Sequence, residues 1–390
     1  MKYDFDNIVD RRNTGSLKWD KYAGRDILPM WVADMDFRCP PQVIEALHQH
    51  VNHGIFGYSA VQGELIKVVV DRLKLLYDWD VDPHWIVWLP GLVPGLNLAC
   101  RCTGGEGDEV ACFVPAYPPF LIAPKLSRQT LKSVPLSRGD NRFYMDPEKF
   151  KQALNSRTKL CVICNPHNPV GREYRAEELK AIVEICLEND IVVCSDEIHC
   201  DLILDDINHV PTALLSEEIA QNTITLLAPS KTFNIPGLNC GLAVISNDQI
   251  RQKFSRLRRD HLPDCNVLGL IAARAAYQHG EDWRRQLIKY LRRNRDLIAE
   301  FIKNEIPLLS MDHIEATYLA WVDVSLLNEA DPIRFFENAG VGLSDGRDYE
   351  GPGYVRLNFG CPQKVLLQAL EKMKQAVAKK IETSVTSVAK

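Results

Sequence analysis

Residues 160–171 read Leu-Cys-Val-Ile-Cys-Asn-Pro-His-Asn-Pro-Val-Gly, and this stretch decides the fold class. Its first five residues form a short apolar run without alternation, which is typical of a strand buried on both faces. An amphipathic segment at 176–188 follows and predicts a helix that ends before Asn189-Asp190. A second apolar run at 191–195 comes directly after it. Strand, helix and strand in this order predict a mostly parallel sheet covered by helices on both faces.

The same alternation extends outward from this core in both directions. Further buried strands are predicted at 85–89, 109–114, 223–227 and 241–245. From 282 to about 304 the pattern changes to one long amphipathic helix. The remainder predicts a smaller α+β unit with strands near 316–322 and 354–358 and helices at 332–339 and 363–379. We therefore expect a large domain of residues 48–281 and a small domain of residues 1–47 together with 282–390.

The composition of the chain limits the classes of binding partner and the cellular compartment that we expect. The chain has a net charge of −5, no apolar core at its N-terminus and no long apolar run, so we expect neither nucleic acid nor a membrane as partner. Twelve scattered cysteines predict a reducing cytoplasm. Cys161 and Cys164 lie three apart on a predicted strand and should face opposite sides, which favours buried thiols over a metal site. His48, His50 and His53 suit a solvated helix face, and no metal is expected.

Chemically useful groups follow five of the predicted strands. In chain order these are a helix start at Pro90-Gly91-Leu92-Val93, then Tyr117, Asn168, Asp196 and Lys231. Each has an ordinary structural explanation, such as a turn, a helix N-cap or a surface charge. However, the carboxyl ends of the strands in an open α/β sheet meet at one edge, where ligands bind. The groups should therefore converge on one site.

A planar, anionic cofactor that bears a carbonyl group would use every group at this edge. A lysine forms an imine with an aldehyde, and a carboxylate keeps a pyridine nitrogen protonated. A helix N-terminus binds phosphate through its free N–H groups, and an aromatic side chain stacks on the ring. These are the needs of pyridoxal 5'-phosphate (PLP).

Three motifs resemble the fold-type-I PLP-dependent enzymes of the aminotransferase class I/II superfamily. They are N-P-x-N-P-x-G at 165–171, S-D-E-I-H at 195–199 and S-K-T-F-N-I-P-G-L at 230–238. Phrases at 10–12, 16–20, 30–37, 56–58 and 355–362 resemble the MalY/PatB-type carbon–sulfur β-lyase branch. The resemblance covers nearly the whole chain. It implies an α/β fold of the fold-type-I PLP-dependent transferases, with a mostly parallel central sheet in a large domain and a smaller α+β domain.

The resemblance also implies roles for individual residues around the cofactor. Lys231 would carry it as a Schiff base and act as the catalytic base, and Asp196 would pair with its pyridine nitrogen. The other cofactor-binding residues implied by the family are Tyr117 and Asn168 at the ring, His199 near the phenolic oxygen, and Leu92, Val93, Ser230 and Tyr58 at the phosphate.

On the substrate side, Arg356, Asn168 and Ala33 would contact an amino acid, with Arg356 holding its α-carboxylate. Tyr58 would reach the phosphate of a neighbouring subunit, so a homodimer is expected. His199 stands where many aminotransferases have a tyrosine, which favours the lyase branch. Asn239 and Ala228 stand where many aminotransferases have a phosphate-binding arginine and serine, so PLP retention is expected to be weaker.

The predicted function is PLP-dependent carbon–sulfur β-elimination. Cystathionine, cysteine or a related S-conjugate would yield a thiol, pyruvate and ammonia. The alternative is a class I/II aminotransferase, because the same lysine serves both reactions. A purely binding role is disfavoured by the presence of Lys231, Asp196 and Arg356 together.

Overall fold

The computed structural model describes residues 2–388, so Met1, Ala389 and Lys390 of the predicted small domain lie outside the described residues. Its main sheet has seven strands in the order β2-β10-β9-β8-β7-β3-β4. These strands are β2 (Ile86–Leu89), β3 (Glu109–Val114), β4 (Thr130–Pro135), β7 (Thr158–Cys164), β8 (Val192–Asp196), β9 (Thr223–Leu227) and β10 (Gly241–Val244). β10 is antiparallel to both of its neighbours, and the other strands run parallel. The predicted mostly parallel sheet is therefore confirmed.

All six strands predicted for this sheet are present, and β3 and β9 have the predicted bounds. The sequence analysis missed β4, which pairs only with β3 at the edge of the sheet. An edge strand buries less of its surface, and β4 carries Lys132 and Ser133 among its half-buried residues. Its sequence therefore lacks the continuous apolar run that marks the central strands.

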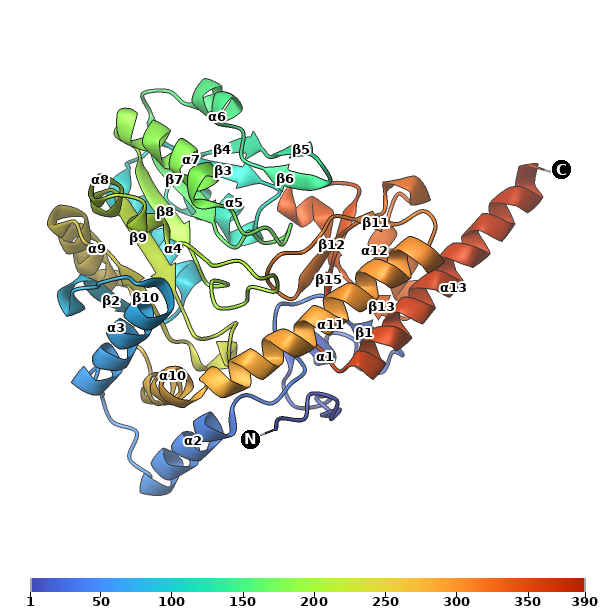
Figure 1. The fold of residues 1–390 in the computed structure, drawn as a ribbon, viewed down its shortest axis with the longest axis horizontal. Helices are drawn as coiled ribbons and strands as arrows, with labels where there is room; N and C mark the ends of the chain where they lie inside the picture. The colour runs from blue at the N-terminus through green and yellow to red at the C-terminus, as the bar shows by residue number, and fades with distance from the viewer. Residues whose placement is uncertain (1, 389–390) are drawn as a thin grey trace.

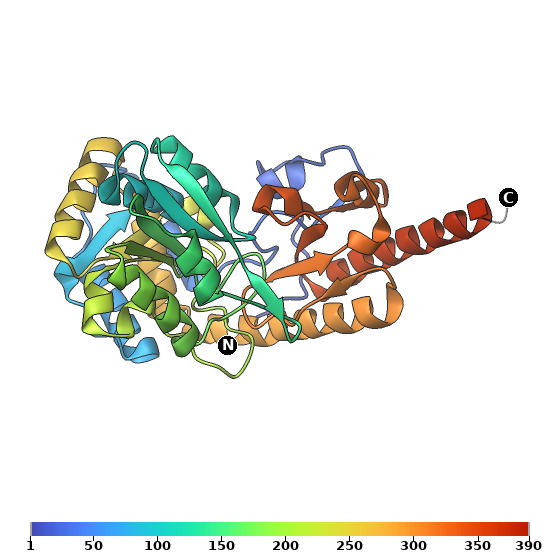
Figure 2. The same ribbon diagram turned by 90° about the horizontal axis from the view of Figure 1, so that it is seen from above.

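Helices cover both faces of the main sheet (Figures 1 and 2). One face packs against α4 (Leu92–Thr103), α5 (Pro118–Leu126) and α9 (Asp248–His261). The other packs against α6 (Pro147–Ala153), α7 (Ala176–Glu188) and α8 (Glu217–Gln221), and toward β2 against α3 (Gly63–Tyr77) and α10 (Val267–His279). Cys161 and Cys164 belong to the cores of opposite faces, as predicted.

A second sheet of four strands has the order β11-β12-β15-β14 and is antiparallel. Its strands are β11 (Ser310–Met311), β12 (Leu319–Asp323), β14 (Ser344–Asp345) and β15 (Tyr354–Asn358). It packs with α11 (Glu281–Glu305), α12 (Pro332–Asn338) and α13 (Gln363–Val388) around one large core. The last helix was expected to end at 379, but no glycine or proline follows Pro362, so nothing in the sequence stops it there.

The N-terminal segment lies on this smaller unit. After α1 (Leu17–Asp20), β1 (Leu28–Pro29) pairs in parallel with β13 (Val341–Gly342). The chain then enters α2 (Pro41–His53), which projects beside α10 (Figure 1). His48 and His53 are exposed on α2, as predicted. A small hairpin of β5 (Ser137–Gly139) and β6 (Arg142–Tyr144) completes the strands.

The domain boundaries at 47/48 and 281/282 stay a prediction. Among the helices of residues 2–388, none combines the length and apolarity needed to cross a membrane.

Candidate active site

A cavity of about 390 Å³ lies beyond the carboxyl ends of β2, β3, β7, β8 and β9. Ten residues named from the sequence line it: Ala33, Leu92, Val93, Tyr117, Asn168, Asp196, His199, Ser230, Lys231 and Asn239. Residues from five separate strand ends and from the N-terminal segment thus meet in one place. The expectation that these groups converge is confirmed, while their individual roles stay predictions.

Lys231 and Asp196 are the two ionisable groups that define the chemistry of this cavity. Lys231 lies in the turn after β9, and its Nζ donates a hydrogen bond to the Ala33 carbonyl at 2.7 Å. Burial and the nearby Arg356 lower the pKa of Lys231 to about 8. Burial raises the pKa of Asp196, at the end of β8, to about 7. A buried carboxyl group with this pKa lacks sufficient positive charge around it, and a cationic ring nitrogen would supply that charge.

His199 is a fully buried, neutral ring beside these two groups. Burial, together with the charges of Lys231 and Arg356, lowers its pKa to about 3. Its ring packs edge-on against Tyr318, with centroids 6.1 Å apart. Its Nδ1 atom has no hydrogen-bond partner among the described residues. A ring held in this way can exchange a hydrogen bond with a ligand without adding charge.

The start of α4 lines one part of the cavity with free backbone N–H groups. Gly91 precedes the helix with a φ of 151°, a conformation that favours glycine. No described side chain caps this helix, so the N–H groups of Leu92 and Val93 are left for another acceptor. The next residue, Pro94, has no N–H group to satisfy. The backbone therefore presents two adjacent donors where a phosphate would bind.

Arg356 comes from β15 of the smaller unit and meets the cavity at Asn168. Its Nη1 donates to Asn168 Oδ1 at 3.0 Å, and its Nη2 donates to the Trp31 carbonyl at 2.9 Å. Ser344 Oγ also donates to that carbonyl, at 2.8 Å. The guanidinium lies 4.9 Å from the centroid of the Tyr349 ring, a cation–π contact. Arg356 Nε is buried without a hydrogen-bond partner in the described chain, so one donor is left for a substrate carboxylate.

Two other residues named from the sequence, Tyr58 and Ala228, lie outside the cavity. Tyr58 is fully exposed in the segment between α2 and α3 and does not line this cavity. Asn239, which lines the cavity, has a positive φ of 50°. Ala228 is buried but does not line the cavity.

A buried charged cluster behind Asp196 was missed by the sequence analysis. His209 lies between Glu173 and Glu197, with one ring nitrogen 3.0 Å from each carboxylate. Burial alone would lower the pKa of His209, but the two carboxylates raise it to about 10. Glu197 also accepts a hydrogen bond from Ser195 Oγ at 2.8 Å. The cluster therefore anchors the end of β8, on which Asp196 lies.

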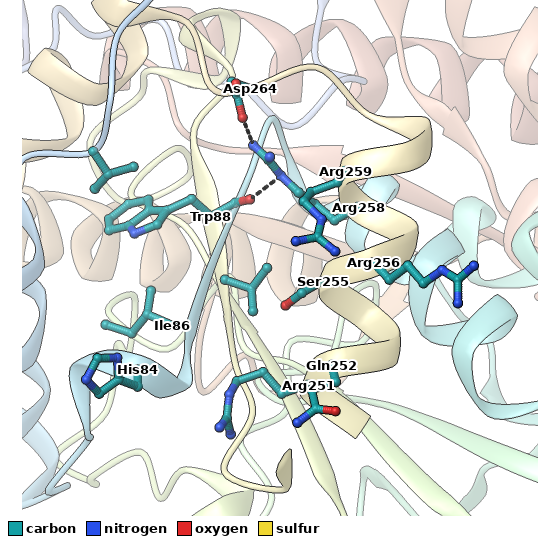
Figure 3. Close-up of a pocket in the computed structure, with 12 residues that line it drawn as sticks. His84, Ile86, Trp88, Arg251, Gln252, Ser255, Arg256, Arg258, Arg259 and Asp264 are labelled. Carbon is teal, nitrogen blue, oxygen red and sulfur yellow. Dashed lines mark hydrogen bonds and ion pairs between the residues drawn. The ribbon is translucent and has the colours of Figure 1, made fainter. Parts of the chain in front are cut away.

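A second hollow, of about 660 Å³, lies between α9 and the edge strand β2 (Figure 3). It is rich in arginine, but Arg258 pairs with Asp264 at 2.5 Å and Arg251 donates to two backbone carbonyls. None of the site residues predicted from the sequence lines it. Within residues 2–388, no group of three or more His, Cys, Asp or Glu side chains is arranged to hold a metal ion. The cavity at Lys231 is therefore the candidate active site.

The fold and this cavity together define the class of the protein. The chain belongs to the aminotransferase class I and II family, whose family model matches residues 25–373. A curated relative, "Cystathionine beta-lyase PatB" of Bacillus subtilis, is 37% identical over 385 residues, covering 96% of this chain and all of the relative. The fold class and the branch resemblance predicted from the sequence are thereby confirmed.

Two solved structures are also similar over almost their whole length. "OvoB" is 44% identical with a TM-score of 0.94, and the match covers 96% of this chain and 99% of that one. Cystalysin from Treponema denticola, which contains a pyridoxal 5'-phosphate cofactor, is 32% identical with a TM-score of 0.93. That match covers 97% of this chain and all of cystalysin.

Proposed function

We propose that this chain is a PLP-dependent carbon–sulfur β-lyase. Its substrates would be cystathionine, cysteine or a related S-conjugate, and its products a thiol, pyruvate and ammonia. The observation that carries the proposal is the enclosed cavity in which the buried amine of Lys231 and the buried carboxyl of Asp196 lie together. The similarity to a cystathionine β-lyase over 96% of the chain supports the reaction type.

The residues of the cavity fit PLP on three separate observations. The α4 N-terminus offers two uncapped N–H groups to a phosphate. The raised pKa of Asp196 fits a partner that brings a positive charge. The buried Nδ1 of His199 lacks a partner in the described residues and can bond a polar group on the cofactor.

Bound PLP supplies an aldehyde that condenses with amines and a ring that withdraws electrons from the substrate Cα. The chain's own residues then have distinct tasks. With a pKa of about 8, Lys231 is partly neutral at neutral to mildly alkaline pH and can take the Cα proton at Nζ. Arg356 and Asn168 orient the substrate carboxylate, since the guanidinium already bonds Asn168 Oδ1. Asp196 carries the charge that keeps the ring nitrogen protonated.

One assay tests the reaction. With cystathionine, β-elimination consumes one water and releases homocysteine, pyruvate and ammonia in equal amounts. We expect thiol and pyruvate to appear together over many turnovers of the PLP-loaded protein. A single stoichiometric conversion that gives a keto acid without a thiol would instead indicate the aminotransferase reaction. An absorbance band at about 420 nm that disappears on treatment with borohydride would show that the cofactor is bound to the lysine.

We further propose that the enzyme is a homodimer with shared active sites. Ile55, Phe56 and Tyr58 are exposed, large and mostly apolar, in the segment that follows the projecting helix α2. Such a surface is typical of a protein–protein contact. A partner's Tyr58 would complete the phosphate site. Sedimentation of the purified protein at micromolar concentration should give twice the chain mass of 44.2 kDa, and a single-chain mass would contradict the proposal.

A cytoplasmic location is also proposed. Its support is that all twelve cysteines are free thiols, ten of them buried, which suits a reducing compartment. The proposed partner of the site is a small amino-acid substrate.

Asn239→Arg is expected to slow the loss of PLP. Asn239 lines the cavity, so an arginine there can add a charge-assisted bond to the phosphate. The strain of its positive φ is present with and without PLP, so the added bond, worth about 1.5 kcal/mol, lowers the Kd about tenfold. PLP dissociation is followed by dialysis and absorbance. Gln249→Arg, which adds the same charge on the exposed surface of α9, is the matched control. An unchanged Kd for Asn239→Arg would show that the phosphate is already fully bound.

A further inference from the structure

One short backbone segment contacts both cations of the site. The Trp31 carbonyl accepts from Arg356 Nη2 at 2.9 Å, and the Ala33 carbonyl accepts from Lys231 Nζ at 2.7 Å. Tyr318 also donates to Ala33, at 3.0 Å. The chain bends at Val32 and Ala33, where the Asp34 N–H donates to the Val32 carbonyl at 3.0 Å, so the two carbonyls belong to one short bend. The spacing of this segment therefore sets the separation of the amine and the guanidinium.

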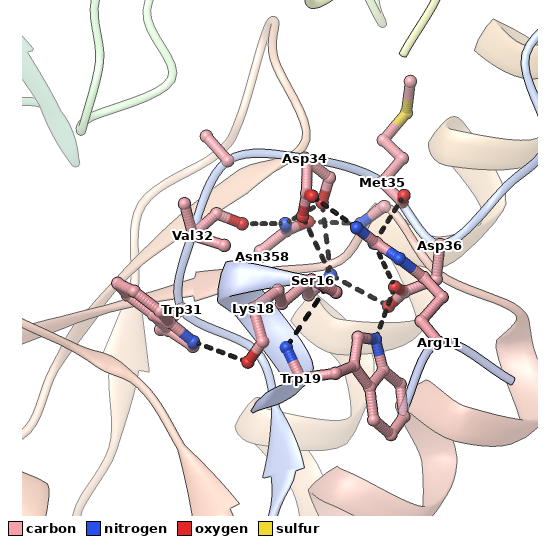
Figure 4. Close-up of polar contacts among 12 residues, drawn as sticks. Arg11, Ser16, Lys18, Trp19, Trp31, Val32, Asp34, Met35, Asp36 and Asn358 are labelled. Atoms are coloured by element: carbon pink, nitrogen blue, oxygen red, sulfur yellow. Dashed lines mark hydrogen bonds and ion pairs between the residues drawn. The ribbon is translucent and has the colours of Figure 1, made fainter. Parts of the chain in front are cut away.

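The carbonyls of Val32 and Asp34, in the same segment, are held by other side chains. Asn358 Nδ2 donates to the carbonyls of Val32 at 2.6 Å and of Asp34 at 2.7 Å (Figure 4). Lys18 Nζ donates to the Asp34 carbonyl as well, at 3.1 Å. The segment has no regular secondary structure between Met30 and Phe37. Backbone hydrogen bonds of Met30 and Asp36 hold its two ends, and these side chains hold its middle.

Four charged side chains lie together at this segment, and we name Arg11, Lys18, Asp34 and Asp36 the ionic clamp (Figure 4). Arg11 bonds Asp34 at 2.6 Å and Asp36 at 2.7 Å. Lys18 Nζ bonds Asp36 Oδ2 at 2.8 Å. Trp19 Nε1 donates to the other oxygen of Asp36 at 2.9 Å. The two positive and two negative groups balance, so the clamp carries no net charge.

The clamp is largely removed from water. The Lys18 side chain has no exposed surface, and that of Asp36 is 5% exposed. Burial raises the pKa of Asp36, but Lys18, Trp19 and Arg11 hold it below its usual value, so the carboxylate is ionised. Buried ion pairs cost so much desolvation that apolar side chains often stabilise a fold equally well. Stability alone therefore does not account for the clamp, whereas a need for fixed geometry does.

We propose that the ionic clamp positions Lys231 and Arg356 for catalysis by fixing the backbone of residues 31–34 on which both cations rest. Arg11 and Lys18 are then positioning residues that never touch the substrate. This inference rests on the proposed function, because it assigns the two cations to one reaction. A small shift of the segment would displace both of them together, and a displacement of about 1 Å can cost about 100-fold in rate.

The test compares Arg11→Met and Lys18→Met with Arg12→Met. Arg12 is the matched control because it neighbours Arg11 but pairs with Asp10 on the surface, where both side chains are more than 60% exposed. We expect kcat/KM to fall about 10- to 100-fold in the clamp variants, with kcat lowered and KM raised. The control should stay within about twofold, since surface pairs contribute little.

A second measurement uses the cofactor-free protein. Lys231 is labelled with acetic anhydride at pH about 10, above its pKa of about 8, and its labelling rate is read by mass spectrometry. We expect faster labelling of Lys231 in the clamp variants than in wild type or Arg12→Met. If Lys18→Met does not fold, Arg11→Met serves alone, because its side chain is 22% exposed and tolerates replacement better.

The outcomes separate the two proposals. If the clamp serves only stability, the clamp variants will have a lower melting temperature, but their Lys231 labelling rate, kcat and KM will equal those of wild type. This result would overturn the inference. If the wild-type protein shows no absorbance band at about 420 nm and releases no thiol, the proposed function is refuted instead. The labelling comparison would remain interpretable in that case, because it needs no cofactor.

Discussion

Lys231→Ala is expected to reduce thiol release from cystathionine at least about 10⁴-fold. The variant loses the amine that we propose holds the cofactor and takes the Cα proton. His199 also lines the cavity, but its pKa of about 3 makes it too weak a base to replace the amine. The same variant should lose the absorbance band at about 420 nm even when PLP is present in excess.

The matched control for this variant is Lys180→Ala. Lys180 is exposed on α7, where it pairs with Glu184 at 3.6 Å, so its loss should leave activity and spectrum unchanged. Both variants are assayed for thiol and pyruvate at equal protein concentration. If Lys231→Ala turns over at more than about a tenth of the wild-type rate, Lys231 is not the general base.

His209→Leu is expected to lower the free energy of unfolding by about 3–5 kcal/mol, because it leaves two buried carboxylates without their cation. Glu173 and Glu197 each lie 3.0 Å from a ring nitrogen of His209, and all three side chains are at most 1% exposed. Urea unfolding of the cofactor-free protein measures the loss. His261→Leu, at the exposed end of α9, is the control and should change stability by less than about 0.5 kcal/mol.

The same pair of proteins tests the pH dependence. The pKa of His209 rises from about 6.5 in the unfolded chain to about 10 in the folded one. Its contribution is therefore fully present below pH about 6.5 and is lost as the pH rises through about 10. The difference in stability between wild type and His209→Leu should narrow between pH 7 and pH 10. A difference that stayed constant over this window would mean that His209 is neutral in the folded protein.

The sequence predicted the central architecture because the central strands carry a strong local signal. β7, β8 and β9 are short apolar runs, each buried almost throughout, and such runs need no information from elsewhere in the chain. β4 was not predicted because it is an edge strand with a strand partner on one side only, and polar residues interrupt its apolar ones. The extent of α13 was underestimated because a chain without stop signals gives no local mark of its end.

The candidate site was predictable where a residue follows a strand and hidden where it depends on distant pairing. Asp196 and Lys231 could be placed at one sheet edge because parallel strands bring their carboxyl ends together. By contrast, His209 meets Glu173 across 36 residues of sequence, and Lys18 meets Asp36 across 18. No spacing rule links such pairs, since whole elements such as α7 and β8 lie between their members. Only the folded backbone brings their charges together.

The pairing of β1 with β13 has a consequence for the order of folding. This two-stranded sheet joins Leu28 to Val341, and the Trp31 carbonyl meets Arg356 across 325 residues. Contacts between residues this far apart in the chain form late, because a long loop must close, at a cost in chain entropy, before these contacts can stabilise the fold. A ribosome has therefore made nearly the entire polypeptide before the substrate pocket can assemble. Prematurely terminated chains would carry the lysine-bearing sheet and remain inactive, which confines catalysis to finished molecules.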